Sequence, residues 1–410
     1  MKIFKKSNIF NLLVVLIIIL GLGLRLKNFN VLSVDGHSMR QTDTECVAYF
    51  LYNGKANFFK PKSCLMRPVS NTQGYFFLEM PFYESLIATG YKIFGSEIWV
   101  ARGVNLILYM VGAMALWKFL SLWIDKKTSL LGLLIYSLMP GSIFFVGHAI
   151  HPDVMAVSLI WVALYLILKY SQNNKSRFLV GSGLVMGVSV ASRPFGLIVM
   201  PLLMYFLWKK KSWWQDYLTI VILSVGFYGW WRWWTYFLNL DMSWENWVLH
   251  GREKLFDLGI LKNLIWKNMV GEVMGKTASG LAVIGFLVSL VRKDEKIVPL
   301  GLWTLGVVVY WLIAPNGNLT HQYYADVYIP LVVVLAAIGL NFIFEKNKIL
   351  GILILPILIW NGIKVSSYFF MPYIEADKDI KIAQEIKEEI GEDKKIIYLK
   401  QKNSLFVLRI

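Results

Sequence analysis

The 410-residue chain is poor in charge, in acidic residues and in cysteine. Charged residues make up 17% of it, against about 25% in a soluble domain, which excludes an ordinary water-soluble globular protein. Lys and Arg outnumber Asp and Glu by 42 to 26, giving a net charge of +16. The two cysteines, Cys46 and Cys64, do not have the spacing of a zinc site. One disulfide between them and two free thiols are both compatible with the sequence.

Hydrophobic residues are abundant instead, at 57%, and the mean hydropathy is +0.54. A bilayer core about 30 Å thick needs about 20 mostly apolar residues per helix. We therefore predict an all-α polytopic membrane protein with about eleven transmembrane helices. They lie near residues 8–24, 99–123, 128–147, 153–170, 178–192, 194–208, 214–235, 273–291, 297–314, 325–344 and 349–369. The pair divided at Arg193 and Pro194 could instead form one kinked element.

The basic residues predict the orientation of these segments. The first segment runs on into Arg25 and Lys27 without a small-residue cleavage site, so we expect a retained anchor rather than a signal peptide. Lys and Arg recur on alternate short loops, which places those loops in the cytoplasm. This predicts a multi-pass plasma-membrane protein with an extracytoplasmic active site. Topology and contact with anionic lipid explain the positive charge better than nucleic-acid binding does.

The predicted membrane domain spans residues 1–369 and has two long external loops, at about 25–98 and 236–272. Both loops are rich in aromatic residues, which favour the membrane interface, so we expect helices lying on the outer leaflet. An external C-terminal α/β tail follows at 370–410, with one amphipathic helix and two short strands. This tail is too small for a core of its own. It either docks on the external loops or begins an incomplete domain.

A polar stretch after the first apolar run contains Asp43 and Glu45. The preceding residues add further polar and basic groups: His37, Arg40 and Gln41. Because polar groups near a membrane are costly, this grouping favours a functional site. The alternative is structural: with Thr42 as a cap, Asp43 would lie in the first turn of a helix and satisfy its free N–H groups.

Further polar residues occur at the predicted outer ends of helices. Glu79 lies two residues before a proline that opens an aromatic helix, which alone can be a simple helix start. His151 and Asp153 begin the fourth apolar segment and could bind a metal or a phosphate, although Asp153 could equally be an early-turn acid. Three more candidates for contact with an anionic headgroup, or for interfacial snorkelling, are Arg193, His321 and Tyr324.

The order of these motifs resembles the GT-C glycosyltransferases. It is most similar to the Rgt-type and the protein-mannosyltransferase/aminoarabinose-transferase branches. The motifs are His37–Thr44, Glu79–Pro81, Tyr91–Gly95, Ala101–Arg102, His151–Asp153 and His321–Tyr324. The likeness covers about residues 8–345. One departure is that Thr44 separates Asp43 from Glu45, whereas many relatives have adjacent Asp and Glu.

The resemblance implies an inverting transfer of a sugar from a polyprenyl-phosphate donor, outside the cytoplasm, to a lipid, glycan or protein acceptor. It assigns Asp43 as the catalytic acid, which suits general-base work on an acceptor hydroxyl. Glu79 would then assist with the acceptor or a metal, and Glu45 would be a further supporting acid. The candidates around the donor phosphate or a metal are His151, Asp153, Arg193, His321 and Tyr324. Cations or a divalent metal must neutralise the leaving phosphate.

Two other classes of protein compete with this interpretation. A transporter or flippase of lipid-linked saccharides would often show two similar halves with helices broken at the midplane. This sequence has no evident internal repeat, and its polar residues cluster at one face, which favours an enzyme. A non-catalytic scaffold would have little use for acids grouped with His and Arg. The sugar, the acceptor and any metal requirement stay open.

Overall fold

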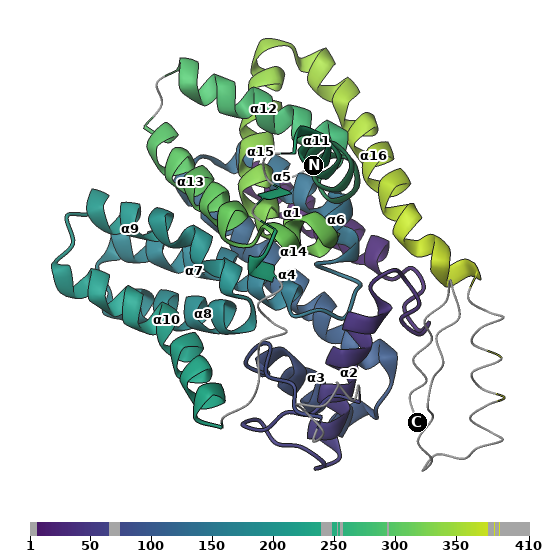
Figure 1. Ribbon diagram of the computed structural model, residues 1–410. Coiled ribbons are helices and arrows are strands. Elements are labelled where there is room, and N and C mark those ends of the chain that lie inside the picture. Colours follow the sequence, from purple (N-terminus) through teal and green to yellow (C-terminus); the bar gives the residue numbers. More distant parts are fainter. Residues whose placement is uncertain are drawn as a thin grey trace.

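The computed structural model describes residues 6–64, 74–238, 248–251, 253–254, 257–292 and 295–375, together with Lys381 and Glu385. Within these residues the regular secondary structure is helical, and the only β features are two isolated bridges in the loop before α3. Figure 1 shows the helices as one bundle, with α2 and α3 together at its lower edge. The predicted all-α class is therefore confirmed.

The helices follow the predicted apolar runs and the loops between them. In chain order they are α1 Lys6–Arg25, α2 Ser38–Tyr52, α3 Phe82–Phe94, α4 Ile98–Trp123, α5 Lys126–Leu138, α6 Pro140–Phe144, α7 Asp153–Asn173, α8 Ser176–Ser192, η1 Pro194–Val199, α9 Met200–Lys209, α10 Trp214–Phe237, α11 Leu258–Asn263, η4 Leu264–Val273, α12 Lys276–Val291, α13 Ile297–Ile313, α14 Pro315–Thr320, η5 Gln322–Tyr328, α15 Ile329–Lys346 and α16 Lys348–Glu375.

Four helices of the described part are long and apolar enough to cross a bilayer. They are Ile98–Trp123, Asp153–Asn173, Gln322–Lys346 and Lys348–Ile374. A fifth span is possible if Leu258–Val273 and Lys276–Val291, which meet at 107°, act as one broken element. The protein is thus an integral membrane protein. The other predicted spans coincide with α10 or with shorter helices, so the structure does not establish a count of eleven.

Local chemistry explains several of these helix ends. The Asp125 carboxylate caps α5 by accepting hydrogen bonds from the backbone N–H groups of Lys127 and Thr128, at 2.7 and 2.8 Å. At the end of α8, Arg193 is extended and Pro194 has no N–H, so the chain breaks there as the sequence predicts. The predicted single segment 128–147 is instead divided into α5 and α6 before Pro140, for the same reason.

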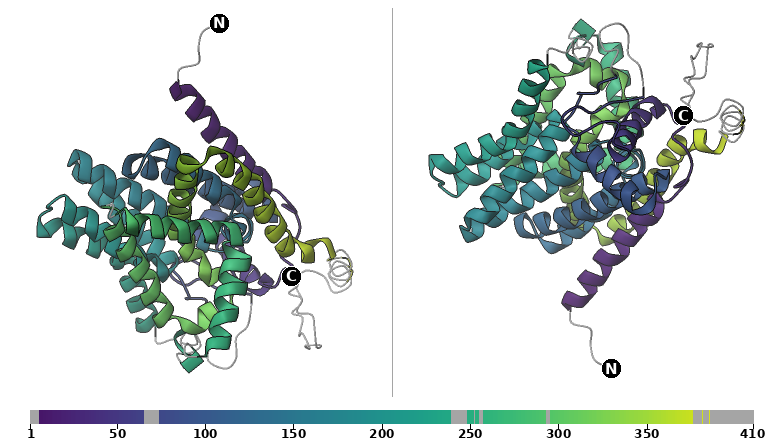
Figure 2. Two further views of the ribbon diagram at one scale, coloured as in Figure 1. Left: turned by 90° about the horizontal axis from the view of Figure 1, so that it is seen from above. Right: turned by 90° about the horizontal axis from the view of Figure 1, so that it is seen from below.

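Helix packing relies on small residues at close contacts. Helices α12 and α15 pack together along their lengths. A Cβ atom added at Gly285 or at Gly339 would overlap a backbone carbonyl of the facing helix, so glycine permits this close approach. Figure 2 shows α1 extending beyond the rest of the bundle at its N-terminal end, where its exposed side chains are apolar. That exposure suits contact with lipid chains.

The segment before α2 is fixed to the bundle by Arg102 of α4. Its guanidinium donates to the backbone carbonyls of Asn28, Phe29 and Val31, at 2.8, 2.9 and 2.6 Å. Helices α2 and α3 confirm the expectation of helices in the loop 25–98. Helix α16 continues past residue 370 to Glu375. Of the predicted tail helix the structure describes Lys381 and Glu385, both helical, and the predicted strands lie outside the described residues.

Candidate active site

Helix α2 carries the polar cluster of the first loop. It begins at Ser38, and its N-cap His37 makes no capping hydrogen bond through its side chain. The expectation of a cap at Thr42 is therefore wrong, because the helix starts one turn earlier. Asp43 lies inside the helix and is only 2% exposed. Its carboxylate is thus not satisfying a helix terminus, which removes the helix-capping alternative for this residue.

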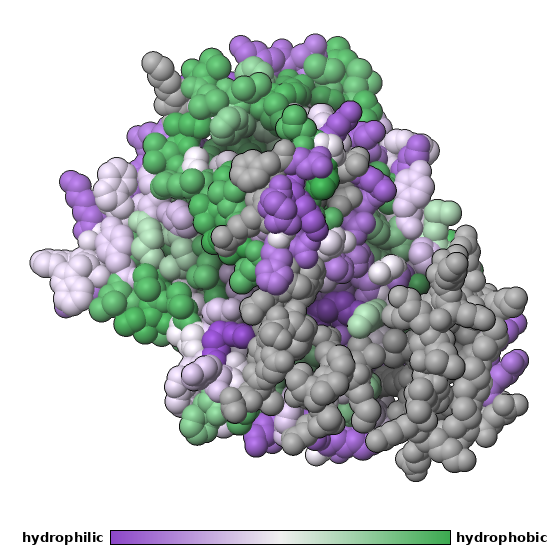
Figure 3. Space-filling view, in the orientation of Figure 1, coloured by the Kyte–Doolittle hydropathy of each residue, from purple (hydrophilic) through white to green (hydrophobic). Residues whose placement is uncertain are grey.

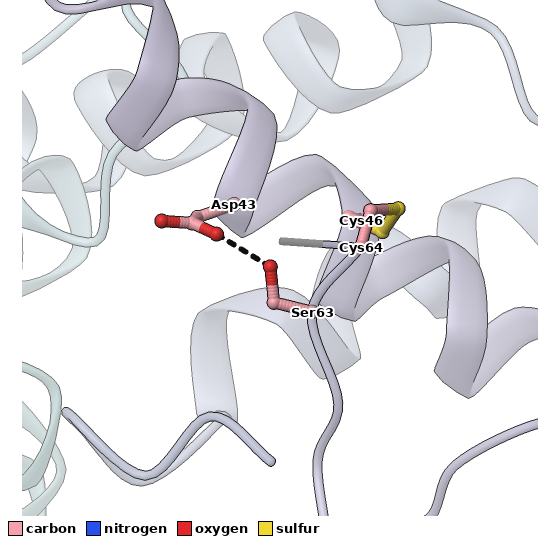
Figure 4. The surroundings of a disulfide bond; sticks show 4 residues. All are labelled: Asp43, Cys46, Ser63 and Cys64. Atoms are coloured by element: carbon pink, nitrogen blue, oxygen red, sulfur yellow. Dashed lines mark hydrogen bonds between the residues drawn. A yellow bond between two sulfur atoms is a disulfide. The ribbon is translucent and has the colours of Figure 1, made fainter. Parts of the chain in front are cut away.

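Asp43 is bound to the loop that follows α2. The hydroxyl of Ser63 donates a hydrogen bond to Asp43 Oδ1. The next residue, Cys64, forms a disulfide with Cys46 of α2, and their Cα atoms are 5.7 Å apart. Figure 4 shows the two links side by side, one turn apart on the helix. The open question of the cysteines is therefore resolved in favour of the disulfide, which holds Ser63 against Asp43.

Arg40 joins α2 to the segment before α3. Its Nη2 donates to the carboxylate of Glu79 in a buried ion pair, and its guanidinium lies 5.3 Å from the centre of the Phe76 ring. The backbone N–H of Met80 donates to the carbonyl of Ala191 near the end of α8, at 3.1 Å. This bond brings Glu79 close to the helix break at Arg193, so two of the predicted motifs meet.

Arg193 and Asp153 form the second ion pair of the site. The Nε and Nη2 atoms of Arg193 donate to Asp153 Oδ2 at 3.0 and 2.6 Å. His151 Nδ1 lies 3.8 Å from the same oxygen, and the His151 ring is fully buried. Burial lowers the pKa of His151 well below its usual value, and the charges of Arg40 and Arg193 lower it further. His151 is therefore neutral at physiological pH.

His37 and the segment after α14 complete the cluster. The His37 Nε2 atom pairs with Gln322 Oε1 at 2.9 Å, and the Gln322 amide donates to Glu272 at 3.0 Å. The His37 and His321 rings lie 5.7 Å apart. Burial and nearby charges lower the pKa of His321 to about 4, and burial also lowers that of His37. The aromatic ring of Tyr324 packs 6.3 Å from His321.

The structure thus brings the predicted residues of five separate segments to one region. In the space-filling view, hydrophilic residues gather in the middle of the face shown in Figure 3, with apolar surface above and to the left. Glu45 and Gln41 also belong to this region, because Ser33 Oγ contacts both side chains, at 2.9 and 3.2 Å. Gln41 Oε1 further accepts from the backbone N–H of Ile150, at 3.0 Å.

Several residues of the site were not predicted. Asp35 Oδ2 accepts hydrogen bonds from Gln41 Nε2 and from the Tyr373 hydroxyl, each at 2.5 Å. Glu84 in α3 and Asp326 in η5 are buried acids whose carboxylate oxygens are not bonded to another residue of the described part. A systematic reading of every acid near a helix start would have found Asp35 and Glu84. Nothing in the sequence points to the partners of Ser63 or Gln322.

The described residues do not make an obvious divalent-metal site. No group of three or more His, Cys, Asp or Glu residues among them is arranged to hold a metal ion. Three predicted acids are already engaged, Glu79 with Arg40, Asp153 with Arg193, and Asp43 with Ser63. The three acids are therefore engaged and do not form a set of metal ligands. The two arginines that two of them bind, Arg40 and Arg193, are cations able to bind an anion.

Comparison with known proteins agrees with this fold. Residues 79–234 match the family model of dolichyl-phosphate-mannose-protein mannosyltransferase. No curated protein sequence matches the chain. The fold is similar to that of ArnT from Cupriavidus metallidurans bound to undecaprenyl phosphate, with a TM-score of 0.65 and 12% identity, covering 93% of this chain and 81% of ArnT.

Two structures of an archaeal oligosaccharyltransferase are also similar. AglB from Archaeoglobus fulgidus in complex with an inhibitory peptide and a dolichol-phosphate has a TM-score of 0.57 and 12% identity, covering 95% of this chain and 59% of that protein. The Archaeoglobus fulgidus oligosaccharyltransferase complex with Zn and sulfate has a TM-score of 0.57 and 13% identity, covering 87% of this chain and 52% of that protein. The chain is thus similar to the dolichyl-phosphate-mannose-protein mannosyltransferase family over residues 79–234, and it shares its fold with ArnT and the archaeal oligosaccharyltransferase.

Proposed function

We propose that the protein transfers a sugar from a polyprenyl-phosphate donor to an acceptor hydroxyl or similar nucleophile at the outer membrane face, with inversion and with Asp43 as general base. The observation that carries the proposal is a buried carboxylate, Asp43, whose charge acts on Arg40 as that of Arg193 does, while Arg40 and Arg193 already bind carboxylates. A base and an anion-binding pair are the two components that this transfer requires.

In the proposed reaction the acceptor oxygen attacks the anomeric carbon of the sugar. The bond from that carbon to the phosphate oxygen breaks, Asp43 takes the acceptor proton, and the lipid phosphate leaves. Ser63 donates to Oδ1 of Asp43, so it orients the carboxylate that acts as base. The disulfide at Cys64 keeps Ser63 in place.

The two arginines stabilise the charge that develops on the leaving phosphate. Each is held by a carboxylate, Arg40 by Glu79 and Arg193 by Asp153, so each is oriented before the donor binds. Glu79 is predicted to assist binding of the acceptor, and Glu45 is a supporting acid that shares the contact of Gln41 with Ser33. His151, His321 and Tyr324 lie around the same pair, where neutral rings give the phosphate an uncharged boundary. No step is assigned to a metal.

The proposed position of the site on the outer side of the membrane rests on the distribution of Lys and Arg among the loops. Asp43 lies in a loop that the positive-inside rule assigns to the outer side. The donor and acceptor classes follow from the similar proteins, which bind undecaprenyl phosphate, dolichol-phosphate and peptides. A lipid, a glycan or a protein acceptor is compatible with the site.

The direct test is Asp43→Asn in membrane vesicles supplied with a radiolabelled polyprenyl-phosphate sugar. We expect transfer to fall by about 10²–10⁴-fold, the usual contribution of a general base. The matched control is Asp257→Asn, at an exposed acid whose carboxylate caps α11, a role that asparagine also performs. Full transfer by Asp43→Asn would refute the assignment of the base.

A further inference from the structure

Glu84 is a buried acid for which the proposed reaction has no role. It lies in the first turn of α3 and is 2% exposed. Neither of its carboxylate oxygens is bonded to another residue of the described part, and the one hydrogen bond that acts on the carboxyl comes from its own backbone N–H. Buried carboxylates are nearly always paired, because an isolated buried charge is costly. An acid left in this state beside an active site requires a reason.

Two arginines act electrostatically on the Glu84 carboxyl. Helix α2 packs on α3, and the Nε and Nη1 atoms of Arg40 are buried without a partner while Nη2 holds Glu79. The bond from the Met80 N–H to Ala191 fixes the segment before α3 beside Arg193. Arg40 and Arg193 are the two cations whose charges act on the Glu84 carboxyl.

Charged and titratable groups come from every element packed on α3. They are Arg40, Asp43 and Glu45 on α2, Arg102 on α4, Arg193 after α8, and Tyr83 and Tyr91 on α3 itself. Arg102 is engaged with the carbonyls before α2, and Asp43 with Ser63. Of the cations around α3, Arg40 and Arg193 are the two whose charges act on the Glu84 carboxyl.

The carboxyl changes its charge close to physiological pH. Burial raises the pKa of Glu84 to about 6, and the charges of Arg40 and Arg193 limit the rise. The arginines therefore face a neutral group in mildly acidic solution and an anion at higher pH. An anion there competes with any phosphate for the same two guanidinium groups.

We propose that Glu84 is a titrating counter-charge to Arg40 and Arg193, and that binding of the anionic donor drives a proton from solvent onto its carboxyl. When the lipid phosphate leaves, the proton returns to solvent and ionised Glu84 rejoins the arginines, which favours product release. The inference rests on the proposed function, because it takes the donor phosphate to bind at these two arginines.

The test measures binding of a polyprenyl methyl phosphate, a phosphodiester whose single charge does not titrate between pH 5 and 8. Its affinity for the full chain in detergent is measured at pH 5.5 and at pH 7.5. We expect wild-type protein to bind about 10-fold more weakly at pH 7.5, the effect of a shift of about one pKa unit on binding. Glu84→Gln should bind equally at both pH values, at the affinity of wild type at pH 5.5.

Two further variants keep this test decisive. Glu84→Met should give the same pH-independent affinity, and it breaks no bond to another residue of the described part. Glu97→Gln is the matched control, since Glu97 is an exposed acid at the N-terminus of α4, and it should keep the wild-type ratio. Titration calorimetry in two buffers of different ionisation heat should detect proton uptake by wild type near pH 6.5 and none by Glu84→Gln.

The outcomes separate this inference from the proposed function. The inference is overturned if wild type binds equally at both pH values or if Glu84→Gln keeps the wild-type ratio. If wild type does not bind the phosphodiester at either pH, the donor assignment fails, and the inference fails with it.

Discussion

The Ser63 hydroxyl donates a hydrogen bond to the Asp43 carboxylate, and Ser63 immediately precedes a half-cystine that is covalently joined to the helix of Asp43. The acid is thus held from two directions, by its own helix and by the loop that returns to it. A base held in one orientation loses less entropy on reaching the transition state than a freely rotating one. Each link can be broken separately.

Removing the hydroxyl should slow catalysis without unfolding the protein. In Ser63→Ala, we expect turnover to fall about 10- to 100-fold, because a hydrogen bond to a charged group contributes about 1.5–3 kcal/mol and 1.4 kcal/mol is a factor of ten. The measurement is steady-state transfer in vesicles. Ser171→Ala is the control, since Ser171 hydrogen-bonds a carbonyl within α7 at the far end of that helix. Unchanged turnover in Ser63→Ala would show that Asp43 does not depend on this bond.

Breaking the disulfide should loosen the same loop. Cys46 and Cys64 are 18 residues apart, and closing a loop of that size contributes about 3 kcal/mol in the chain-entropy model. We expect a water-soluble phosphine reductant to lower the melting temperature and to slow transfer. The double variant Cys46→Ser, Cys64→Ser should show both defects without reductant and no further response to it. A reductant effect that persists in the double variant would mean that the phosphine acts elsewhere.

The sequence predicts the helices and the residues of the site better than it predicts how they are joined. Apolar runs identify the helices because a chain in a bilayer must satisfy its backbone internally. The break at Arg193 is visible because proline imposes it locally. The number of membrane spans cannot be predicted in the same way, because a hydropathy window does not detect the bend between η4 and α12.

The contacts within the site depend on distant parts of the chain. Asp35 binds Tyr373, and the two residues are 338 positions apart. No local sequence pattern near Asp35 predicts its contact with Tyr373. Glu84 differs from Asp35: its place near a helix start marks it as a candidate, but only tertiary packing buries it. Sequence motifs therefore found groups that meet at the site, but not those that hold the groups in place.

The Asp35 and Tyr373 pair should stabilise the docking of α16 on the first loop. Tyr373 donates to Asp35 Oδ2 at 2.5 Å and is 2% exposed. In Tyr373→Phe we expect the free energy of unfolding to fall by about 1.5–3 kcal/mol, because a buried carboxylate loses a donor. Tyr368→Phe is the matched control on the same helix, since Tyr368 is 59% exposed and should change stability by less than about 0.5 kcal/mol. Equal melting temperatures for the two variants would contradict the role of this bond.

His321 should make the folded state less stable in mild acid. Burial, His37 and Arg193 lower the pKa of His321 to about 4, whereas the unfolded chain takes up this proton near pH 6.5. Between those values the unfolded state binds more protons than the folded state, so stability is complete above pH 6.5 and is lost as the pH falls toward 4.

The variant His321→Gln removes this proton and should lose less stability over the same interval. We expect the fall in melting temperature between pH 7 and pH 4.5 to be smaller than that of wild type by about 1–2 °C. His250→Gln, at an exposed histidine, should behave as wild type does. Thermal unfolding in detergent at a series of pH values makes the comparison. If His321→Gln and wild type lose stability in parallel, then His321 takes up its proton equally well in the folded and unfolded chains, and the neutral boundary that we assign to it around the donor phosphate is wrong.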